Sequence, residues 1–467
     1  MTGAPRAAAV ARTWPLVAVT STGTFLGAFD FTVVNVAFPD LQRAFAGASL
    51  ADLSWVLNAY AIAFAAALLP AGGLADLLGR RRVFLSGLAL FTAASGACAL
   101  APSVGVLVAA RVVQAVGGGV LTPTALALLA ARVDPKRRAV AIGLWSATGS
   151  IAAAAGPAAG GALVEAGGWR LVFLVAVPFG ALAVAAGIAL VPDDRPEPAE
   201  PRTGPPDVAA VPLLAGAVAL LALAIVKSPA WGWAAAPTVA AVAGAGALGA
   251  WFAHRSGSHP RPVVDLDVLR ARASALAAAA MLAFGVVLFA MLLCAVLFLE
   301  RAWGYPSDLV GLAVTPGPVA AAIVSVVGGR VTARAGHRAA GAGALLVMAA
   351  GAGALAASTG ARPDYVADFL PGLLLLEAGG GLAFTALNVA AVTAVPPERL
   401  GVASATAATA RAIGSVLGIS LLVVIVGAPG ASSGATPFHA AWAGMAVVAV
   451  AAAALVAAQP ETSVASS

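Results

Sequence analysis

Fourteen long runs of apolar residues divide this chain, and they constrain its fold more than any other feature. A hydrocarbon core about 30 Å thick requires roughly 20 apolar residues in a helix, and every run has about that length or more. Only 10% of the residues are charged, whereas soluble domains carry about 25%. The strands of a membrane β-barrel alternate in polarity, and these runs do not. The sequence therefore predicts an all-α integral membrane protein.

The basic residues predict how the spans are oriented. The predicted spans are 14–38, 53–74, 83–101, 104–131, 139–163, 169–191, 208–227, 232–254, 273–299, 307–329, 339–358, 365–395, 399–427 and 437–458. Because their number is even, both chain ends lie on one side. The amino terminus and the alternate loops on its side hold nineteen Lys or Arg, and the other loops hold five. Basic loops resist translocation, so both termini are predicted to be cytoplasmic.

A proline-rich stretch of mixed charge, 192–207, is the clearest linker in the chain. Six spans precede it, a two-span hairpin at about 208–254 follows, and six more spans come after a second basic connector. We therefore expect three parts: residues 1–191, 192–272 and 273–467. A weak internal repeat supports this division. At an offset of 257, Gly72, Gly79 and Arg81 match Gly329, Gly336 and Arg338.

Several classes of protein are disfavoured. Neither lysine, Lys136 or Lys227, follows a glycine, so the chain has no phosphate-binding loop of the Gly-Lys-Ser/Thr type. No His, Asp and Glu cluster has metal-ligand spacing, and no nucleophile–base set is visible. Cys98 and Cys294 fall inside apolar runs, where small core residues are expected. We therefore predict no enzyme, no cofactor, no metal and no nucleic-acid partner, and any uphill transport must use an ion gradient.

Two charges lie deep in predicted spans. Asp30 precedes the outer end of its span by eight residues, and Arg111 follows the outer end of its span by seven, so both lie about 11–12 Å below the surface. Gln114 shares a helix face with Arg111. Buried charges pair with each other or line a cavity, so Asp30 and Arg111 are candidate partners. The pair would either fix helix packing or couple transport to protons.

Glu377 is the second deep acid. It lies eight residues inside Phe369, or about 12 Å deep, and shares a face with Phe384 and Asn388. Arg411 of the next span could reach a similar level. Two interpretations stay open: a Glu377–Arg411 pair that remains closed, or an acid that contacts substrate. A proton and a cationic substrate could then compete for one carboxylate, and a proton entering through 100 mV brings roughly 2.3 kcal/mol.

Small residues also mark the fifth span. Gly149, Gly156 and Gly160 follow the spacing i, i+7, i+11, which gives one smooth face for close helix packing. Pro157 is expected to bend the same span.

Five motifs resemble those of the major facilitator superfamily, and one of the five resembles the signature of its fourteen-helix drug:proton antiporter family. The stretch from Asp30 to Pro39 resembles the latter family's Asp-x-Thr-Val-Val-Asn-Val-Ala-x-Pro signature, which includes Asn35. The others are Gly-x-Leu-Ala-Asp-x-x-Gly-Arg-Arg at 72–81, Arg-x-x-Gln at 111–114, the glycine-rich antiporter motif at 149–161 and Arg-x-x-Gly-x-x-x-Gly at 411–418. Ala115 and Ala412 depart from the usual Gly and Gln.

The resemblance implies a major facilitator fold: two six-helix bundles plus two extra central helices, fourteen in all. It also implies a monomeric proton-coupled antiporter that exports lipophilic, often cationic, drugs or small metabolites across the bacterial cytoplasmic membrane. A dedicated exporter of one endogenous metabolite or antibiotic is the alternative, and a membrane-embedded receptor or enzyme is disfavoured. The implied coupling residues are Asp30, Arg111 and Glu377. The implied substrate cavity comprises Asp30, Asn35, Gln114, Glu377, Phe384, Asn388 and Arg411. The implied gating residues are Gly73, Asp76, Gly79, Arg80, Gly149, Gly156, Pro157 and Gly160.

Overall fold

The computed structural model describes residues 4–191, 207–260, 262–264, 266–360, 362–393, 400–427 and 434–460, and in this part of the chain every regular element is a helix. The first half contains α1 (Ala4–Val36), α2 (Phe38–Ala44), α3 (Leu50–Leu78), α4 (Arg80–Ala99), α5 (Val104–Arg132), α6 (Pro135–Leu174) and α7 (Ala176–Leu190). The hairpin contains η1 (Val208–Ala210), α8 (Val211–Trp231) and α9 (Ala236–Ser258), followed by η2 (Leu266–Arg270). The second half contains α10 (Arg272–Arg301), α11 (Ser307–Val314), α12 (Pro316–Ala335), α13 (His337–Ser358), η3 (Tyr365–Phe369), α14 (Leu370–Thr393), α15 (Leu400–Val426) and α16 (Thr436–Ala457).

Thirteen stretches of the described chain are long and apolar enough to cross a membrane. One of them, Val140–Leu190, has 51 residues and reverses direction at Gly168, whose φ is 70°. Left-handed backbone of this kind favours glycine because it has no Cβ. This stretch therefore contains two crossings, which agrees with the fourteen predicted spans and confirms the predicted all-α membrane fold.

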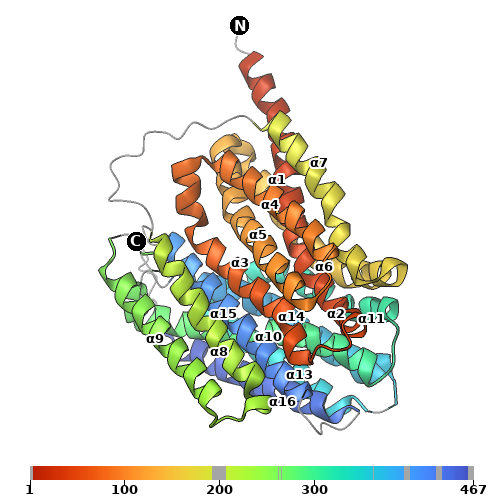
Figure 1. Cartoon of the computed structure of the whole chain (residues 1–467). Coiled ribbons are helices and arrows are strands. Elements are labelled where there is room, and N and C mark those ends of the chain that lie inside the picture. The colour runs from red at the N-terminus through yellow and green to blue at the C-terminus, as the bar shows by residue number, and fades with distance from the viewer. Residues whose placement is uncertain are drawn as a thin grey trace.

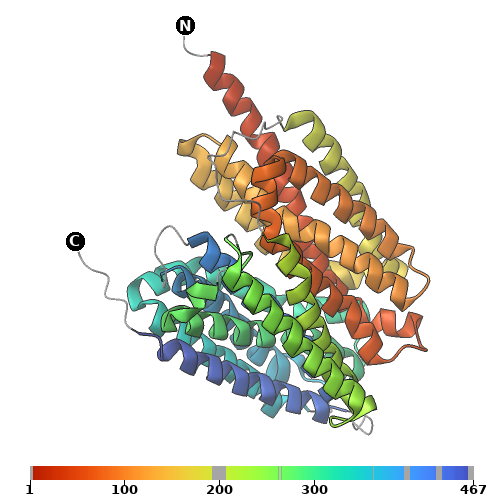
Figure 2. The ribbon, with the colours of Figure 1, turned by 60° about the vertical axis from the view of Figure 1, so that its left-hand side comes forward.

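The helices gather into two groups, which Figure 2 separates by colour. In the first group α3 packs on α5, α1 on α6, and α4 on both α5 and α7. In the second group α13 packs on α14 and α16, and α10 packs on α15 and α16. The groups meet along two seams, α6 against α11 and α3 against α15.

The two-helix hairpin lies over one of these seams (Figure 1). Helix α8 packs against both α3 and α15, so it contacts both groups, while α9 packs on α8. An ion pair of 2.6 Å joins Lys227 of α8 to Asp52 of α3. At the other end of the hairpin, Arg255 donates to both carboxylate oxygens of Asp207 at 2.7–2.8 Å. The first pair thus attaches the hairpin to the first group, the second joins the start of the hairpin to its end, and α8 covers the α3–α15 seam from the side.

The turn between α3 and α4 is shorter than predicted. We expected a glycine- and arginine-rich connection from 72 to 82, but α3 continues to Leu78, so Gly73 and Asp76 belong to its last turns. Only Gly79 lies between the helices, with φ of 95°, and Arg80 already begins α4. The side chains at 73 and 76 lie outside the described residues. Apolar helix formers continue the helix until a glycine can reverse the chain, which explains the difference.

The internal repeat is visible in this turn and its counterpart. Gly336, which the repeat aligns with Gly79, also separates two helices and has φ of 78°. Arg81 donates to the carbonyl of Ile188 near the end of α7, at 2.8 Å. Its counterpart Arg338 donates to a carbonyl at the end of α16 at 2.6 Å. Each arginine therefore binds the negative end of the last helix of its own group.

Two predicted spans are interrupted. The span predicted at 307–329 is divided into α11 and α12 at Thr315, directly before Pro316, because proline lacks the N–H that would continue the helix. The span predicted at 365–395 begins with a π-helical turn, η3, before α14.

Candidate functional site

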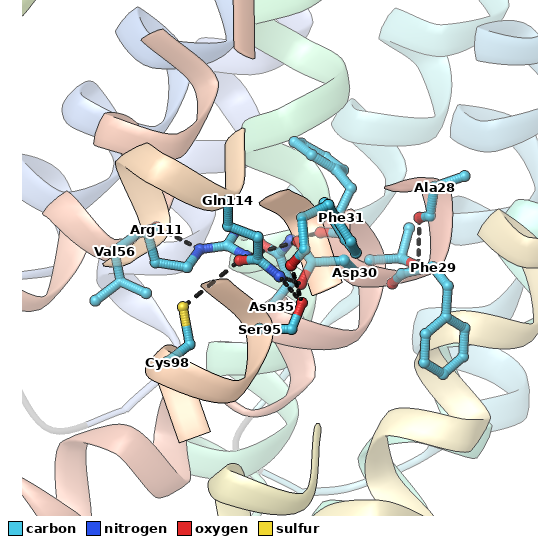
Figure 3. A network of polar contacts seen from close by, with 12 residues as sticks. Ala28, Phe29, Asp30, Phe31, Asn35, Val56, Ser95, Cys98, Arg111 and Gln114 are labelled. Carbon is cyan, nitrogen blue, oxygen red and sulfur yellow. Dashed lines mark hydrogen bonds and ion pairs between the residues drawn. The ribbon is translucent and has the colours of Figure 1, made fainter. Parts of the chain in front are cut away.

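The two deep charges of the first group form a closed ion pair (Figure 3). Nη1 of Arg111 on α5 lies 2.6 Å from Oδ2 of Asp30 on α1, and both side chains are at least 96% buried. Gln114 accepts from the same Nη1 at 2.7 Å and donates to Oδ1 of Asp30 at 2.9 Å. It also donates to Ser95 of α4 at 2.8 Å. The sequence-predicted partners are therefore together, joined by a third side chain.

The rest of the Arg111 guanidinium is also occupied. Its Nε donates to the carbonyl of Val56 at 3.2 Å, and its plane lies 3.8 Å from the ring centroid of Tyr60. A cation over an aromatic face gains electrostatic attraction where water is excluded. This arginine is therefore compensated by a carboxylate, an amide, a carbonyl and a ring, as a charge in the membrane interior requires.

A cavity of about 300 Å³ lies between the two helix groups. Helices α1, α3, α5 and α6 line it from one side, and α10, α12, α14 and α15 line it from the other. We call it the central cavity. Its lining includes Phe31, Thr32, Asn35, Leu57, Tyr60, Arg111, Phe284, Leu288, Phe289, Leu292, Glu377, Phe384 and Ile419. The wall is thus mainly apolar and aromatic.

Among the described residues, Glu377 is the only acid in the lining of the central cavity. It is 5% exposed, and within the described chain no residue pairs with or hydrogen-bonds to its carboxylate. Glycines at 317 and 380 leave room beside it: a Cβ on Gly317 would lie 2.8 Å from its Cγ. Glu377 therefore presents an uncompensated carboxyl group to an apolar space.

A second cavity, of about 250 Å³, contains Arg411. We call it the arginine cavity. Its lining shares Phe31, Thr32, Tyr60, Ala153 and Phe289 with the central cavity, but Glu377 lines only the central cavity. The interpretation of a closed Glu377–Arg411 pair is therefore wrong for this structure.

An aromatic layer lies between the two cavities. Phe31 and Phe289 meet edge to face, with ring centroids 4.7 Å apart, and they come from opposite helix groups. The Arg411 guanidinium carbon lies 5.9 Å from the centroid of Phe289 and 5.7 Å from that of Phe384. Both of these rings line the central cavity. Arg411 and Glu377 thus face different spaces on either side of aromatic side chains.

Not every sequence-predicted cavity residue lines a cavity. Asn35, Glu377 and Phe384 line the central cavity, and Arg411 lines the arginine cavity. Asp30, Gln114 and Asn388 line neither of them. The carboxylate of Asp30 and the side-chain amide of Gln114 are hydrogen-bonded within the ion-pair network. Asn388 donates to the carbonyl of Phe384 on its own helix at 2.7 Å.

Sequence reasoning missed the aromatic wall. Phe31, Tyr60 and Phe289 are part of apolar spans, and their periodicity does not separate a cavity face from a packing face. The position of Phe31 directly after a deep acid was the one signal that could have identified it.

The small residues of α6 provide close contacts on two sides. A Cβ on Gly160 would lie 2.9 Å from Val33 of α1, and a Cβ on Gly156 would overlap Thr32. On the other side, a Cβ on Gly161 would lie 2.9 Å from the Cα of Asp308 in α11. The predicted smooth face at 156 and 160 therefore contacts α1, and the adjacent Gly161 contacts the second group. The contact at Gly149 is less tight, since a Cβ there would lie 3.4 Å from Cγ2 of Thr24.

Polar contacts join the groups at the end opposite the N-terminus. Arg43, directly before the end of α2, binds Glu300 at 2.5 Å and Ser307 at 3.4 Å. Arg301 donates to Gln42 at 2.9 Å. We call these contacts the outer clamp. Nothing in the sequence around Glu300 indicates a partner from the other group.

Two membrane-spanning helix bundles that enclose a cavity with a buried acid define a membrane transporter. Residues 20–419 match the sequence profile described as Major Facilitator Superfamily, and the chain belongs to that family.

Known relatives support this assignment. The chain is 37% identical to the multidrug resistance protein Stp of Mycobacterium tuberculosis, over 88% of this chain and 75% of that protein. It is 31% identical to the methylenomycin A resistance protein of Streptomyces coelicolor, over 87% of this chain and 84% of that protein. The inward open structure of the Escherichia coli xylose transporter XylE superposes with a TM-score of 0.68 over 97% of this chain and 98% of that one, at 14% identity, which shows the shared fold.

Proposed function

We propose that this protein is a proton-coupled antiporter that exports lipophilic drugs or small metabolites across the bacterial cytoplasmic membrane. The observation that carries the proposal is Glu377, an acid without a partner in the described chain, in an apolar cavity between two helix groups. The names of two relatives, a multidrug resistance protein and an antibiotic resistance protein, support export as the activity. A dedicated exporter of one metabolite remains the second candidate, and substrate breadth distinguishes it.

We propose alternating access by rocking of residues 1–191 against 273–467. The hairpin of α8 and α9, within residues 192–272, would move with the helices of the α3–α15 seam. The outer clamp and the tight α6–α11 contact join the two groups at one end of the molecule, and we infer that this is the closed end of the central cavity. The basic loops favour cytoplasmic termini, which would make the closed end the outer one and this conformation inward-facing. The small residues at 149, 156, 157 and 160, with the turn at 73–80, then act as gating elements.

The proposed coupling uses both buried acids. Glu377 in its charged form would hold a cationic group of a substrate, and protonation would release that group. Protonation of Asp30 would remove one partner of Arg111, and an unpaired charge at this depth is unfavourable, which would favour the other conformation. A static pair that only packs α1 on α5 would show no such dependence. A single polypeptide chain is expected to suffice.

Transport into inverted membrane vesicles tests the proposal. We expect uptake of a fluorescent lipophilic cation to require a pH gradient or voltage and to stop when both are collapsed. Asp30→Asn should reduce gradient-driven uptake by at least about tenfold, and the folded variant should still exchange substrate down its own gradient. The matched control is Asp368→Asn, outside both cavities. Uptake indifferent to the collapsed gradients would refute proton coupling, and a receptor or enzyme would show no uptake at all.

A further inference from the structure

The arginine cavity carries a positive charge with nothing in the described chain to neutralise it. Arg411 is the only charged residue in the part of its lining that the structure describes. Among the described residues, none forms an ion pair or hydrogen bond with its guanidinium, and its contacts are the faces of two phenylalanine rings at 5.7 and 5.9 Å. Arg111, the other deep arginine, has a carboxylate, an amide and a carbonyl. Arg411 therefore lacks the hydrogen-bond acceptors that compensate the charge of Arg111.

The surroundings of Arg411 supply one free hydroxyl group and apolar walls. Thr24 lines the same cavity, and its Oγ1 is buried without a hydrogen-bond partner in the described chain. Ser415 lies one helical turn after Arg411 on the same wall, but its hydroxyl donates to the carbonyl of Ala412 at 2.7 Å. Phe64, Leu68 and Leu121 make the remaining wall apolar. A guanidinium has five N–H donors and no acceptor, so a group that satisfies it must offer acceptor oxygens.

We infer that the arginine cavity is a binding site for the anionic oxygen group, carboxylate, phenolate or sulfonate, of a lipophilic substrate. This inference rests on the proposed export function and specifies which substrates it includes. A carboxylate would accept charge-assisted hydrogen bonds from Arg411, with the hydroxyl of Thr24 beside it, while an aromatic body packs on Phe31 and Phe289. The two cavities thus have opposite charges, Glu377 for a cation and Arg411 for an anion.

The separation of these charges defines the expected range of substrates. The cavities share five lining residues, and the contact between Phe31 and Phe289 lies between them, so one elongated substrate contacts both cavities when these two rings move apart. Organic acids would bind at Arg411 alone, and zwitterions would bind at both ends. A transporter that used Arg411 only to balance Glu377 would instead place the two side chains within pairing distance, and this structure does not.

A matched pair of dyes tests the inference: a xanthene dye with a free carboxylate and its methyl ester. Binding to the purified full-length protein is measured by fluorescence polarisation, and transport by uptake into inverted vesicles. We expect Arg411→Gln to weaken binding of the free acid by about tenfold or more, since it removes a charge-assisted bond, and to change binding of the ester less than twofold. Arg411→Lys should restore part of the affinity for the acid, and Arg362→Gln, an exposed loop arginine, should change neither.

The alternative outcomes are separable. Equal loss for acid and ester, with the variant correctly folded by size-exclusion chromatography, would overturn the inference and give Arg411 a structural role. Unchanged affinity for the acid would also overturn it. If the wild type carries a lipophilic cation but neither binds nor carries the acid, this inference fails while the export function stands. If no dye of any charge is transported, the export function itself fails.

Discussion

Nη1 of Arg43 lies 2.5 Å from Oε1 of Glu300 at the end of the molecule away from the N-terminus. The two residues are 257 positions apart in the chain and belong to opposite helix groups. With Ser307 and the Arg301–Gln42 bond, they join the two groups at this end of the molecule. Their contact depends on the relative position of the groups, so it must break if the cavity opens at this end.

Weakening the outer clamp should increase opening at this end. The Arg43 side chain is 56% exposed, and exposed pairs contribute about 0–1 kcal/mol, so Arg43→Ala should raise the open population by no more than about fivefold. The measurement is labelling of Leu292→Cys, in the central cavity, by a membrane-impermeant maleimide added to whole cells, with Cys98 and Cys294 replaced by alanine. The charge swap of Arg43→Glu with Glu300→Arg should restore low labelling. Low labelling in the single variant would mean that the clamp does not hold this end.

Adding one methyl group at the α6–α11 contact should increase opening at this end more than weakening the outer clamp does. A Cβ on Gly161 would lie 2.9 Å from the backbone of Asp308, which cannot move without shifting α11. Overpacking costs about 1–3 kcal/mol, and here the cost falls on the closed state alone. Gly161→Ala should therefore increase labelling of the Leu292→Cys reporter more than Arg43→Ala does. Gly105→Ala, where nothing lies within 4 Å, is the control. Equal labelling in both glycine variants would contradict the assigned contact.

Glu377→Gln should distinguish substrate recognition from coupling. If the carboxylate holds the cation, cation affinity falls as pH is lowered, by up to about tenfold per pH unit for one competing proton. The variant should lose both the affinity and its pH dependence, while binding of a neutral dye is retained. Binding titrations from pH 5 to 9 provide the measurement, and Glu165→Gln, an exposed acid, is the control. A cation affinity that remains pH-dependent in Glu377→Gln would assign the effect to another group.

The two equivalent turns should respond equally to substitution. Gly79→Ala and Gly336→Ala force a side chain into backbone with φ of 95° and 78°, at a cost of about 1–3 kcal/mol each. Gly329→Ala, inside α12 with nothing within 4 Å, should instead be neutral or stabilise by about 0.4–1 kcal/mol. In thermal unfolding in detergent, the midpoint temperature of Gly329→Ala should be equal to or higher than that of the wild type, and the midpoints of both turn variants should be lower. Stability unchanged in either turn variant would contradict its positive φ.

The number and order of the spans could be read directly from the chain. Backbone N–H and C=O groups in lipid must form hydrogen bonds within the segment itself, so an apolar run long enough to cross the bilayer forms a helix. The same local logic identified the deep acids and arginines, since a charge in an apolar run stands out without any knowledge of its neighbours. The pairing of Asp30 with Arg111 followed from depth alone, because both lie seven or eight residues below the same surface.

Depth alone was misleading for Glu377 and Arg411. They were predicted to lie at similar levels, but the two cavities lie at different levels along the helices. Residues 31–35 of α1 and 57–60 of α3 line the central cavity, and residues 23–32 and 60–68 of the same helices line the arginine cavity. The relative level of two helices depends on how they pack on each other, and the sequence contains no signal for it. Glu300 was missed for the same reason: its partner Arg43 belongs to the other group.

The sequence by itself therefore determined the helices and which charges lie deep within them. The tertiary structure decided which of those charges are paired, which face a cavity, and how the two groups are clamped. The physical reason is that helix formation in lipid depends on local composition, whereas each of these contacts joins side chains from helices far apart in sequence.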